Sequence, residues 1–306
     1  MSDAPVIDVQ HLRKTYGPTV AVADVSLTVG RGEIFGILGP NGAGKTTTVE
    51  AMVGLRPIDG GRVRVLGLDP HRDTRRVRER VGIQLQEARL PAQLRVGEAL
   101  ELYASFYPAP ADTEELLDLL GLTAQRHAAF ATLSGGQQQR LSIALALVGN
   151  PEIAVLDELT TGLDPHARRA TWDLIAQVRE RGVTIVLITH SMDEAEHLCD
   201  RLAIIDHGTV LTTGRPGDLT AVASRYTLRM PAATLPLAAH VLPDAAAVDL
   251  AAGELEVAGG PAELTAALTT LAAHGLTPTD IRTRSRTLED VFLALAEEAP
   301  SPLGAR

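Results

Sequence analysis

The sequence predicts an α/β core with an antiparallel β subdomain and a helical subdomain, followed by a small α+β domain. Short buried apolar runs alternate with helical patterns over the first two thirds of the chain, as in α/β proteins. Between them, residues 88–150 show helical periodicity with few strand signals. Near residue 221 the chain becomes rich in alanine and its glycine motifs stop, which indicates a second domain.

Strands and helices can be placed in order along the first part. Residues 7–12 and 21–29 alternate like exposed antiparallel strands, and residues 34–38 (IFGIL) read as a buried strand. A glycine-rich turn follows that strand and leads into a helix at 46–55. Further buried strands are predicted at 153–156, 183–188 and 202–205, and further helices at 96–107, 113–120 and 137–148.

The second part alternates strands and helices over a shorter stretch. Strands are predicted at 226–230, 254–257 and 281–284, and helices at 262–274 and 288–297. This alternation is typical of a small α+β domain. We therefore expect a first domain at 1–220, an accessory domain at 221–300 and a frayed tail at 301–306.

Composition excludes several classes of protein. With 45% hydrophobic and 22% charged residues, the chain of 306 residues is globular. Its formal net charge of −10 argues against a protein that coats nucleic acid, so no nucleic-acid partner is expected. The single cysteine, Cys199, cannot form an internal disulfide bond. We find no secretory signal, and the longest apolar stretch, 230–243, is broken by proline, so a cytoplasmic protein is expected.

Lysine is almost absent. Of the 28 basic residues, only Lys14 and Lys45 are lysines. A coding bias that replaces lysine with arginine explains the general trend. Where a lysine survives such a bias, its compact ammonium group is a candidate for a specific role.

A phosphate-binding loop is predicted between the strand at 34–38 and the helix that follows. Residues 39–46 read GPNGAGKT and fit the pattern G-x-x-x-x-G-K-[ST]. Such a loop points successive backbone N–H groups at phosphate oxygens, Lys45 reaches the β- and γ-phosphates, and the Thr46 hydroxyl binds Mg²⁺. The residues assigned to the nucleotide here are Gly39, Pro40, Asn41, Gly42, Ala43, Gly44, Lys45, Thr46 and Thr47.

Two carboxylates end the strand at 153–156, in the segment IAVLDE. The carboxyl ends of strands in open α/β sheets line the crevice where ligands bind. Beside a phosphate loop, Asp157 is expected to hold Mg²⁺ and Glu158 to polarise the attacking water. Taken alone, the segment is equally typical of a strand that runs into a solvated acidic turn.

The pentapeptide LSGGQ opens a helix that is predicted to begin at Gln137. Serine and two glycines at a helix start are typical of an anion site and, equally, of an ordinary N-cap. This segment comprises Leu133, Ser134, Gly135, Gly136 and Gln137.

Together GPNGAGKTT, LSGGQQQR, IAVLDE, TGLDP and LITH resemble, in this order, the ATP-binding cassette of ABC transporters over about residues 6–219. The resemblance implies a P-loop NTPase (RecA-like) core with ATP and Mg²⁺ as cofactors. It assigns Tyr16 to stacking on adenine, the alternative being a packed aromatic at a strand end. It assigns His190 to the γ-phosphate and Asp164 to the dimer interface.

The resemblance also implies a glutamine that senses Mg²⁺ and links the site to the membrane subunit. Gln86 fits this role better than its neighbour Gln84, because Glu87 follows it. The implied Mg²⁺ ligands are then Thr46, Gln86 and Asp157. Where the family usually has proline after the catalytic glutamate, this chain has Leu159, and we expect a turn of altered rigidity that still supports hydrolysis.

The chain has one phosphate-binding loop and one LSGGQ segment, the family's signature. By resemblance, a second cassette completes each site, and we expect a homodimer. The C-terminal segment TLEDVFLAL, 287–295, resembles the ATP-binding subunits of daunorubicin-resistance-type exporters, and it also fits a capped amphipathic helix. The expected protein is an ATP-hydrolysing exporter subunit for a drug, antibiotic or lipid-like substrate. It would act with a separate membrane permease on the cytoplasmic face. The alternative is a cassette ATPase that acts on ribosomes or DNA.

Overall fold

The computed structural model describes residues 4–84, 90–222, 225–242, 247–249, 253–284 and 287–298. The chain forms two compact units, Met1–Gly214 and Arg215–Arg306. Their boundary precedes α8 (Pro216–Val222), which belongs to the second unit, whereas the change in composition had placed the boundary at 220.

The first unit is built on one mixed sheet whose strand order is β4-β1-β2-β9-β8-β3-β7-β6-β5. Five neighbouring strands, β8, β3, β7, β6 and β5, pair in parallel, and β4, β1 and β2 pair antiparallel. The strands are β1 (Ile7–Tyr16), β2 (Thr19–Val29), β3 (Ile34–Leu38), β4 (Gly60–Val65), β5 (Val81–Gln84), β6 (Ile153–Asp157), β7 (Thr184–Thr189), β8 (Arg201–Asp206) and β9 (Thr209–Gly214). The predicted α/β core with an antiparallel β subdomain is confirmed.

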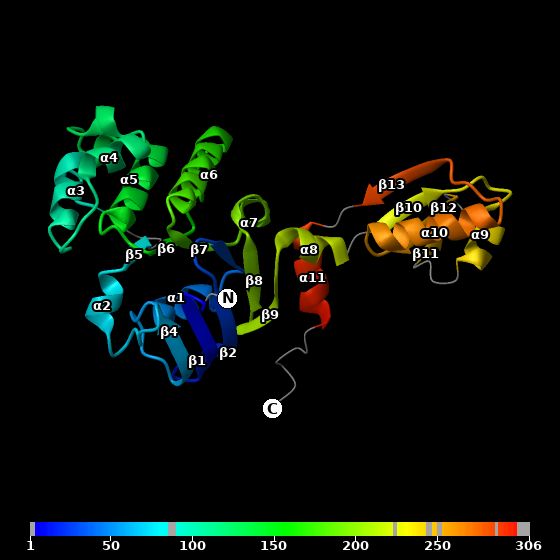
Figure 1. The fold of residues 1–306 in the computed structure, drawn as a ribbon, viewed down its shortest axis with the longest axis horizontal. Helices are drawn as coiled ribbons and strands as arrows, with labels where there is room; N and C mark the ends of the chain where they lie inside the picture. Colours follow the sequence, from blue (N-terminus) through cyan, green and yellow to red (C-terminus); the bar gives the residue numbers. More distant parts are fainter. Residues whose placement is uncertain are drawn as a thin grey trace. The chain divides into compact units, whose positions relative to one another are not determined.

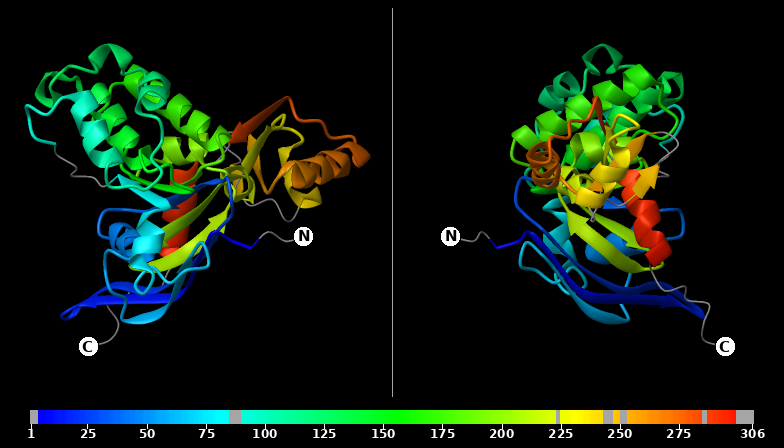
Figure 2. Two further views of the ribbon diagram at one scale, coloured as in Figure 1. Left: turned by 60° about the vertical axis from the view of Figure 1, so that its left-hand side comes forward. Right: turned by 90° about the vertical axis from the view of Figure 1, so that its right-hand side faces the viewer.

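Helices surround this sheet and also form a separate group. They are α1 (Lys45–Met52), α2 (Thr74–Arg78), α3 (Val96–Ala104), α4 (Thr113–Leu119), α5 (Gly135–Leu147), α6 (Pro165–Glu180) and α7 (Met192–Leu198). Helices α3, α4 and α5 pack together as the predicted helical subdomain (Figure 1). The β1–β2 hairpin, dark blue in Figure 2, lies on the side of this unit away from them.

The parallel strands form the centre of the core because both of their faces are covered. Every residue of β3, β6 and β7 is buried, as the continuous apolar runs predicted. Cys199 is buried behind β3, where its Sγ atom packs over Gly36. Burial raises the pKa of this thiol, so Cys199 is a core residue.

The second unit contains a four-stranded antiparallel sheet of order β11-β12-β10-β13. In chain order it runs β10 (Arg225–Arg229), α9 (Leu235–Val241), β11 (Ala247–Asp249), β12 (Glu254–Ala258), α10 (Pro261–Ala273) and β13 (Asp280–Arg284), which is the split-βαβ arrangement. Leu228, Leu255 and Leu271 are fully buried between the sheet and its helices. The predicted small α+β fold is therefore present.

The last helix, α11 (Leu288–Glu298), packs against α8 within the second unit. Leu288 and Val291 on this helix are buried. At its start, Thr287 and Asp290 form the capping pair that the sequence predicts, since each backbone N–H donates to the other's side chain (2.9 and 3.3 Å).

Candidate nucleotide site

Three adjacent parallel strands bring the predicted chemistry to one edge of the sheet. Strand β7 lies between β3 and β6, and Thr189 pairs with Leu38 while Ile188 pairs with Asp157. The phosphate loop follows β3, the acidic pair ends β6, and His190 follows β7. Since parallel strands end at the same edge, these segments meet there.

The phosphate loop is held between β2 and the turn after β8. A Cβ atom on Gly44 would collide with the carbonyl oxygen of Ala21, and one on Gly39 would collide with that of Ile205. Gly44 also has a positive φ of 97°, which non-glycine residues rarely adopt. The backbone N–H of Gly208 donates to the carbonyl of Ala43 (2.9 Å). Glycine is therefore required here by close packing as well as by conformation.

Lys45 is buried at the start of α1. Its Nζ atom donates to the carbonyl oxygens of Gly39 (2.7 Å) and Pro40 (3.0 Å). Burial lowers the pKa of Lys45, and the nearby charges of Glu158 and Asp157 act in the opposite direction. The ammonium group thus lies inside the loop, beside both carboxylates, where it can meet a phosphate.

Asp157 and Glu158, the acidic pair at the end of β6, lie in different environments. Asp157 is buried, and the loss of hydration, with the neighbouring Glu158 charge, raises its pKa to about 6. Glu158 has a left-handed backbone with φ of 49°, and its backbone N–H donates to the carbonyl of Ile188 (2.9 Å). Leu159, where the family usually has proline, is buried.

His190 lies directly against the candidate catalytic carboxylate. Its Nδ1 atom is 3.1 Å from Oε1 of Glu158. The side chain of Glu158 is 11% exposed and that of His190 48% exposed, so the pair lies at the mouth of the site. A carboxylate that contacts an imidazole is a common arrangement for activating water.

Of the two candidate glutamines, Gln84 and Gln86, the structure describes only Gln84. Gln84 is the last residue of β5 and is buried, and its Oε1 atom accepts a hydrogen bond from the backbone N–H of Asp157 (3.0 Å). It therefore supports the acidic strand end from the side. Gln86 lies outside the described residues, so its assignment remains a prediction.

The signature segment starts α5. Ser134 is the N-cap, its hydroxyl accepts from the backbone N–H of Gln137 (3.3 Å), and the Gln137 side chain accepts from the N–H of Ser134 (2.9 Å). The helix consequently begins at Gly135, two residues before the predicted Gln137, because this reciprocal cap stabilises a glycine-rich first turn. The alternative of an ordinary N-cap is thus present in the structure, and it leaves the N–H groups of Gly135 and Gly136 at the helix end.

Asp164 has a local role that the sequence reasoning missed. It caps α6, accepting from the backbone N–H groups of His166 and Ala167 (both 2.9 Å), with Pro165 in the first turn. The hydrogen bond from Ala167 lowers the pKa of Asp164. The Asp-Pro pair before a helical pattern was the available signal.

Tyr16 ends β1 at the tip of the β1–β2 hairpin and is 42% exposed. Lys14 lies over its ring with Nζ 5.4 Å from the ring centre. The same Nζ atom is 3.0 Å from Oδ1 of Asp59, the residue directly before β4. Tyr16 is therefore an exposed ring with Lys14 over one face. The alternative of a packed aromatic at a strand end describes it only partly, and its assignment to adenine remains a prediction.

Glu194, which sequence reasoning also missed, joins three segments behind the site. Its Oε1 atom accepts from the Thr160 hydroxyl (2.9 Å) and from Nε1 of Trp172 (3.2 Å). It thereby ties α7, which follows His190, to the turn after Glu158 and to α6. No motif marked this residue, because its partners lie 34 and 22 residues away.

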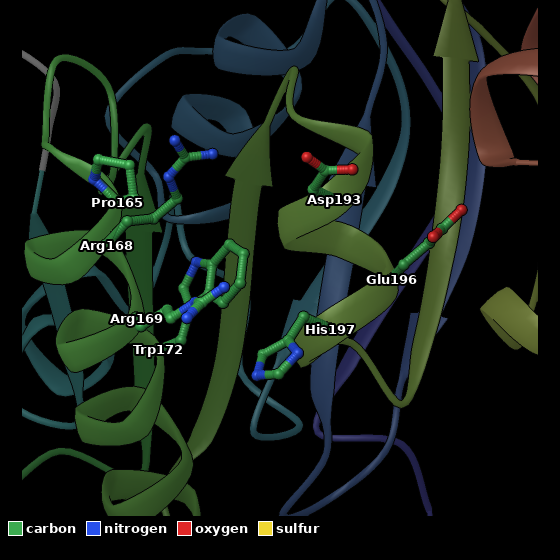
Figure 3. A pocket seen from close by; sticks show the side chains of 7 residues that line it. All are labelled: Pro165, Arg168, Arg169, Trp172, Asp193, Glu196 and His197. Atoms are coloured by element: carbon green, nitrogen blue, oxygen red, sulfur yellow. The ribbon is translucent and has the colours of Figure 1, made fainter.

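A cavity of about 440 Å³ lies between α6 and α7, outside the phosphate loop (Figure 3). Trp172 and His197 stack in its wall with ring centres 4.6 Å apart. Arginines from α6 and the carboxylates of Asp193 and Glu196 from α7 complete it. Its charges are mixed, so it does not compete with the loop as a phosphate site.

The donors near the loop fit a magnesium ion that is shared with phosphates. Thr46 offers a hydroxyl and Asp157 a carboxylate, whereas the described residues contain no cluster of three or more His, Cys, Asp or Glu side chains that could hold a metal alone. Mg²⁺ commonly keeps several waters and binds through one or two protein oxygens plus substrate phosphates. In the same part of the chain, no helix is long and apolar enough to cross a membrane.

Comparisons with known proteins agree with this geometry. Residues 22–161 match the family model described as "ABC transporter". The chain is 39% identical over 224 residues to the Nod factor export ATP-binding protein I of Ralstonia nicotianae, covering 72% of this chain and 70% of that protein. It is 40% identical over 218 residues to the protein of the same name from Rhizobium etli, covering 70% and 69%.

Solved structures show the same fold. The chain resembles cbiO1 of Clostridium perfringens, part of the ABC transporter complex cbiONQ, at 27% identity and a TM-score of 0.65, covering 71% of this chain and 90% of that one. It also resembles the dimeric cassette MJ0796 bound to ADP and Pi, at 29% identity and a TM-score of 0.60, covering 68% and 98%. With its glycine-rich loop, acidic strand end and His190 at one sheet edge, this chain belongs to the ATP-binding, ATP-hydrolysing proteins of the ABC transporter family.

Proposed function

We propose that this chain binds MgATP on the loop 39–47 and hydrolyses it with Glu158 as the residue that orients and deprotonates water. Lys45 and His190 stabilise charge on the γ-phosphate, and Gln86 completes the catalytic set. Thr46, Asp157 and Gln86 hold the Mg²⁺, which offsets phosphate charge when bound. Tyr16 stacks on adenine.

One observation carries this proposal: Glu158 contacts His190 (3.1 Å) beside Asp157 and Lys45. Phosphoryl transfer requires little covalent help from the protein, so the placement of charge around the γ-phosphate decides the rate. A carboxylate held by an imidazole, with an ammonium group and a second carboxylate nearby, supplies that placement.

The test replaces Glu158 with glutamine, which keeps its shape and removes its basicity. We expect Glu158→Gln to lower kcat at least about 100-fold while the Kd for ATP changes less than about threefold. Glu180→Gln, the same change at the exposed end of α6, is the matched control. Unchanged turnover in Glu158→Gln, with normal ATP binding, would remove Glu158 from this role.

We further propose a homodimer in which Ser134–Gln137 of one copy cover the nucleotide on the loop of the other, with Asp164 at the interface. The solved cassette MJ0796, which this chain resembles, is dimeric. The exposed helix end at Gly135 and Gly136 offers N–H groups to a phosphate. Light scattering with ATP should show Glu158→Gln as a dimer and Glu158→Gln/Ser134→Arg as a monomer.

The transport role we propose is export of a drug, antibiotic or lipid-like substrate through a separate permease, on the cytoplasmic face of the membrane. The relatives named for Nod factor export support the direction of transport. Co-expression with its permease partner should move the chain to the membrane fraction. Equal membrane recovery with and without that protein would contradict the proposal.

A further inference from the structure

Lys14, the chain's other lysine, lies against Tyr16, the residue that we assign to adenine stacking. Lys14 is only 8% exposed, although lysine is rarely buried without a partner. Its Nζ atom contacts Oδ1 of Asp59 (3.0 Å) and lies 5.4 Å from the centre of the Tyr16 ring. The ammonium group is thus held by a carboxylate and covers one face of an aromatic ring.

Asp59 holds this segment with both of its carboxylate oxygens. While Oδ1 takes Lys14, Oδ2 accepts from the backbone N–H and from the hydroxyl of Thr15 (both 2.7 Å). These hydrogen bonds from Thr15, together with Lys14, lower the pKa of Asp59 to about 2. The carboxylate is therefore ionised at any physiological pH, and it fixes the two residues that precede Tyr16.

The same segment is tied to the phosphate loop by an irregularity in the hairpin. Lys14 and Thr15 pair with β2 on either side of Ala21, which is the extra residue of a β-bulge. The carbonyl of Ala21 packs against Gly44 so closely that a Cβ atom could not fit between them. The distance from the loop to Tyr16 is consequently set by a short, rigid stretch of backbone.

We propose that Lys14 is a positioning residue that leaves Tyr16 one free face, opposite the ammonium group, on which adenine stacks. The face of an aromatic ring is electron-rich, so two stacked rings repel each other electrostatically. A cation on one face offsets that charge and favours a purine on the other. A compact ammonium group fits the space between Asp59 and the ring, which explains a lysine in a chain of arginines.

This inference rests on the proposed stacking of adenine on Tyr16, and the experiment separates the two. The full chain is titrated with MgATP and, in parallel, with magnesium tripolyphosphate, which has the phosphates without a base. The variants are Lys14→Met, Tyr16→Ala and the double variant. Arg13→Met, an exposed residue of the same strand, is the matched control, and thermal unfolding checks the fold of each.

We expect Lys14→Met to weaken MgATP about fivefold and Tyr16→Ala about tenfold, with tripolyphosphate changed less than about twofold in both. The double variant should be no weaker than Tyr16→Ala, because Lys14 acts through the ring. An equal loss for ATP and tripolyphosphate in Lys14→Met would reduce Lys14 to a fold-stabilising residue and overturn the inference. The inference would also be overturned if Lys14→Met bound ATP normally while Tyr16→Ala bound ATP more weakly than the unaltered protein. Normal ATP affinity in Tyr16→Ala would remove the stacking itself, and the inference with it.

Discussion

The imidazole Nδ1 of His190 lies 3.1 Å from Oε1 of Glu158, although 32 residues separate them in the chain. The contact exists because β6 and β7 are parallel neighbours whose carboxyl ends are level. It couples the group proposed to activate water to the group proposed to meet the γ-phosphate. When Nδ1–H donates to the carboxylate, Nε2 is the ring atom left for the nucleotide.

Removing the imidazole should therefore slow hydrolysis without abolishing binding. We expect His190→Ala to lower kcat by about 10²-fold or more and to change the Kd for ATP by less than about fivefold. Single-turnover hydrolysis and equilibrium binding measure the two quantities. His240→Ala, an exposed histidine of the second unit, controls for the substitution itself. A variant that binds poorly but turns over normally when saturated would assign His190 to binding alone.

Asp157 should make the nucleotide-free protein less stable as the pH rises. Its pKa is about 6 in the folded chain against an ordinary value of 3.8, so folding disfavours the ionised form. The free-energy cost of carrying an ionised Asp157 in the folded state is absent below about pH 4, grows as the pH rises through 6 and is complete above 7. Each unit of pKa change on folding corresponds to about 1.4 kcal/mol. The rise from 3.8 to about 6 therefore destabilises the folded state by at most about 3 kcal/mol.

Asp157→Asn removes this cost. In Mg²⁺-free buffer we expect its Tm to exceed that of the unaltered protein by about 4 °C at pH 7.5 and to match it at pH 4. With MgATP the order should reverse, because the variant lacks a ligand for the ion. A Tm difference that is constant between pH 4 and 7.5 would show that ionisation of Asp157 is not its source.

Apolar runs and fixed motifs predicted the core of this protein well, for local reasons. The buried strand at 34–38 coincides with β3, since five consecutive apolar or glycine residues between turn signals leave few alternatives. The loop GPNGAGKT and the pair Asp157–Glu158 could be singled out because the residues of each motif are adjacent in the sequence. Strands β4, β5, β9 and β11 were missed. β5 and β11 have only four and three residues, β4 begins with two glycines, and β9 has no fully buried residue.

The supporting contacts of the site could not be predicted, because they join residues far apart in sequence. Lys14 meets Asp59 across 45 residues, and Gln84 meets Asp157 across 73. No periodicity reports which polar side chain a distant strand will face. For Lys14 the only sequence signal was its survival as a lysine, which indicated a role and left the partner open.

Gly36, in the middle of β3, should resist even the smallest side chain. A Cβ atom there would lie 2.7 Å from Sγ of Cys199 and 3.1 Å from Cβ of Leu202. We expect Gly36→Ala to lower the free energy of unfolding by about 1–3 kcal/mol through overpacking. Cys199→Ala removes the nearer atom, so the double variant should be more stable than the sum of the single changes by about 1 kcal/mol. Strict additivity in urea unfolding would place the strain elsewhere.

Glu194 should be required to hold α7 against α6 and the turn after Glu158, and through these contacts it should be required for turnover. Glu194→Ala leaves the hydroxyl of Thr160 and Nε1 of Trp172 without their buried acceptor, which costs about 2–4 kcal/mol. Glu194→Gln retains Oε1 and should lose less than half as much. The chain has one tryptophan, so emission from Trp172 reports directly on this junction during denaturant unfolding.

The control for Glu194 is Glu196→Ala, an exposed position on the same helix, which should stay within about 0.5 kcal/mol of the unaltered protein. Because Glu194 links the turn after Glu158 to the helix after His190, Glu194→Ala should also lower kcat at temperatures where the variant is folded. Normal turnover by folded Glu194→Ala would show that the contact between Glu158 and His190 forms without this support. Equal loss of stability in Glu194→Gln and Glu194→Ala would show that the charge, and not the acceptor atom, is what these three segments need.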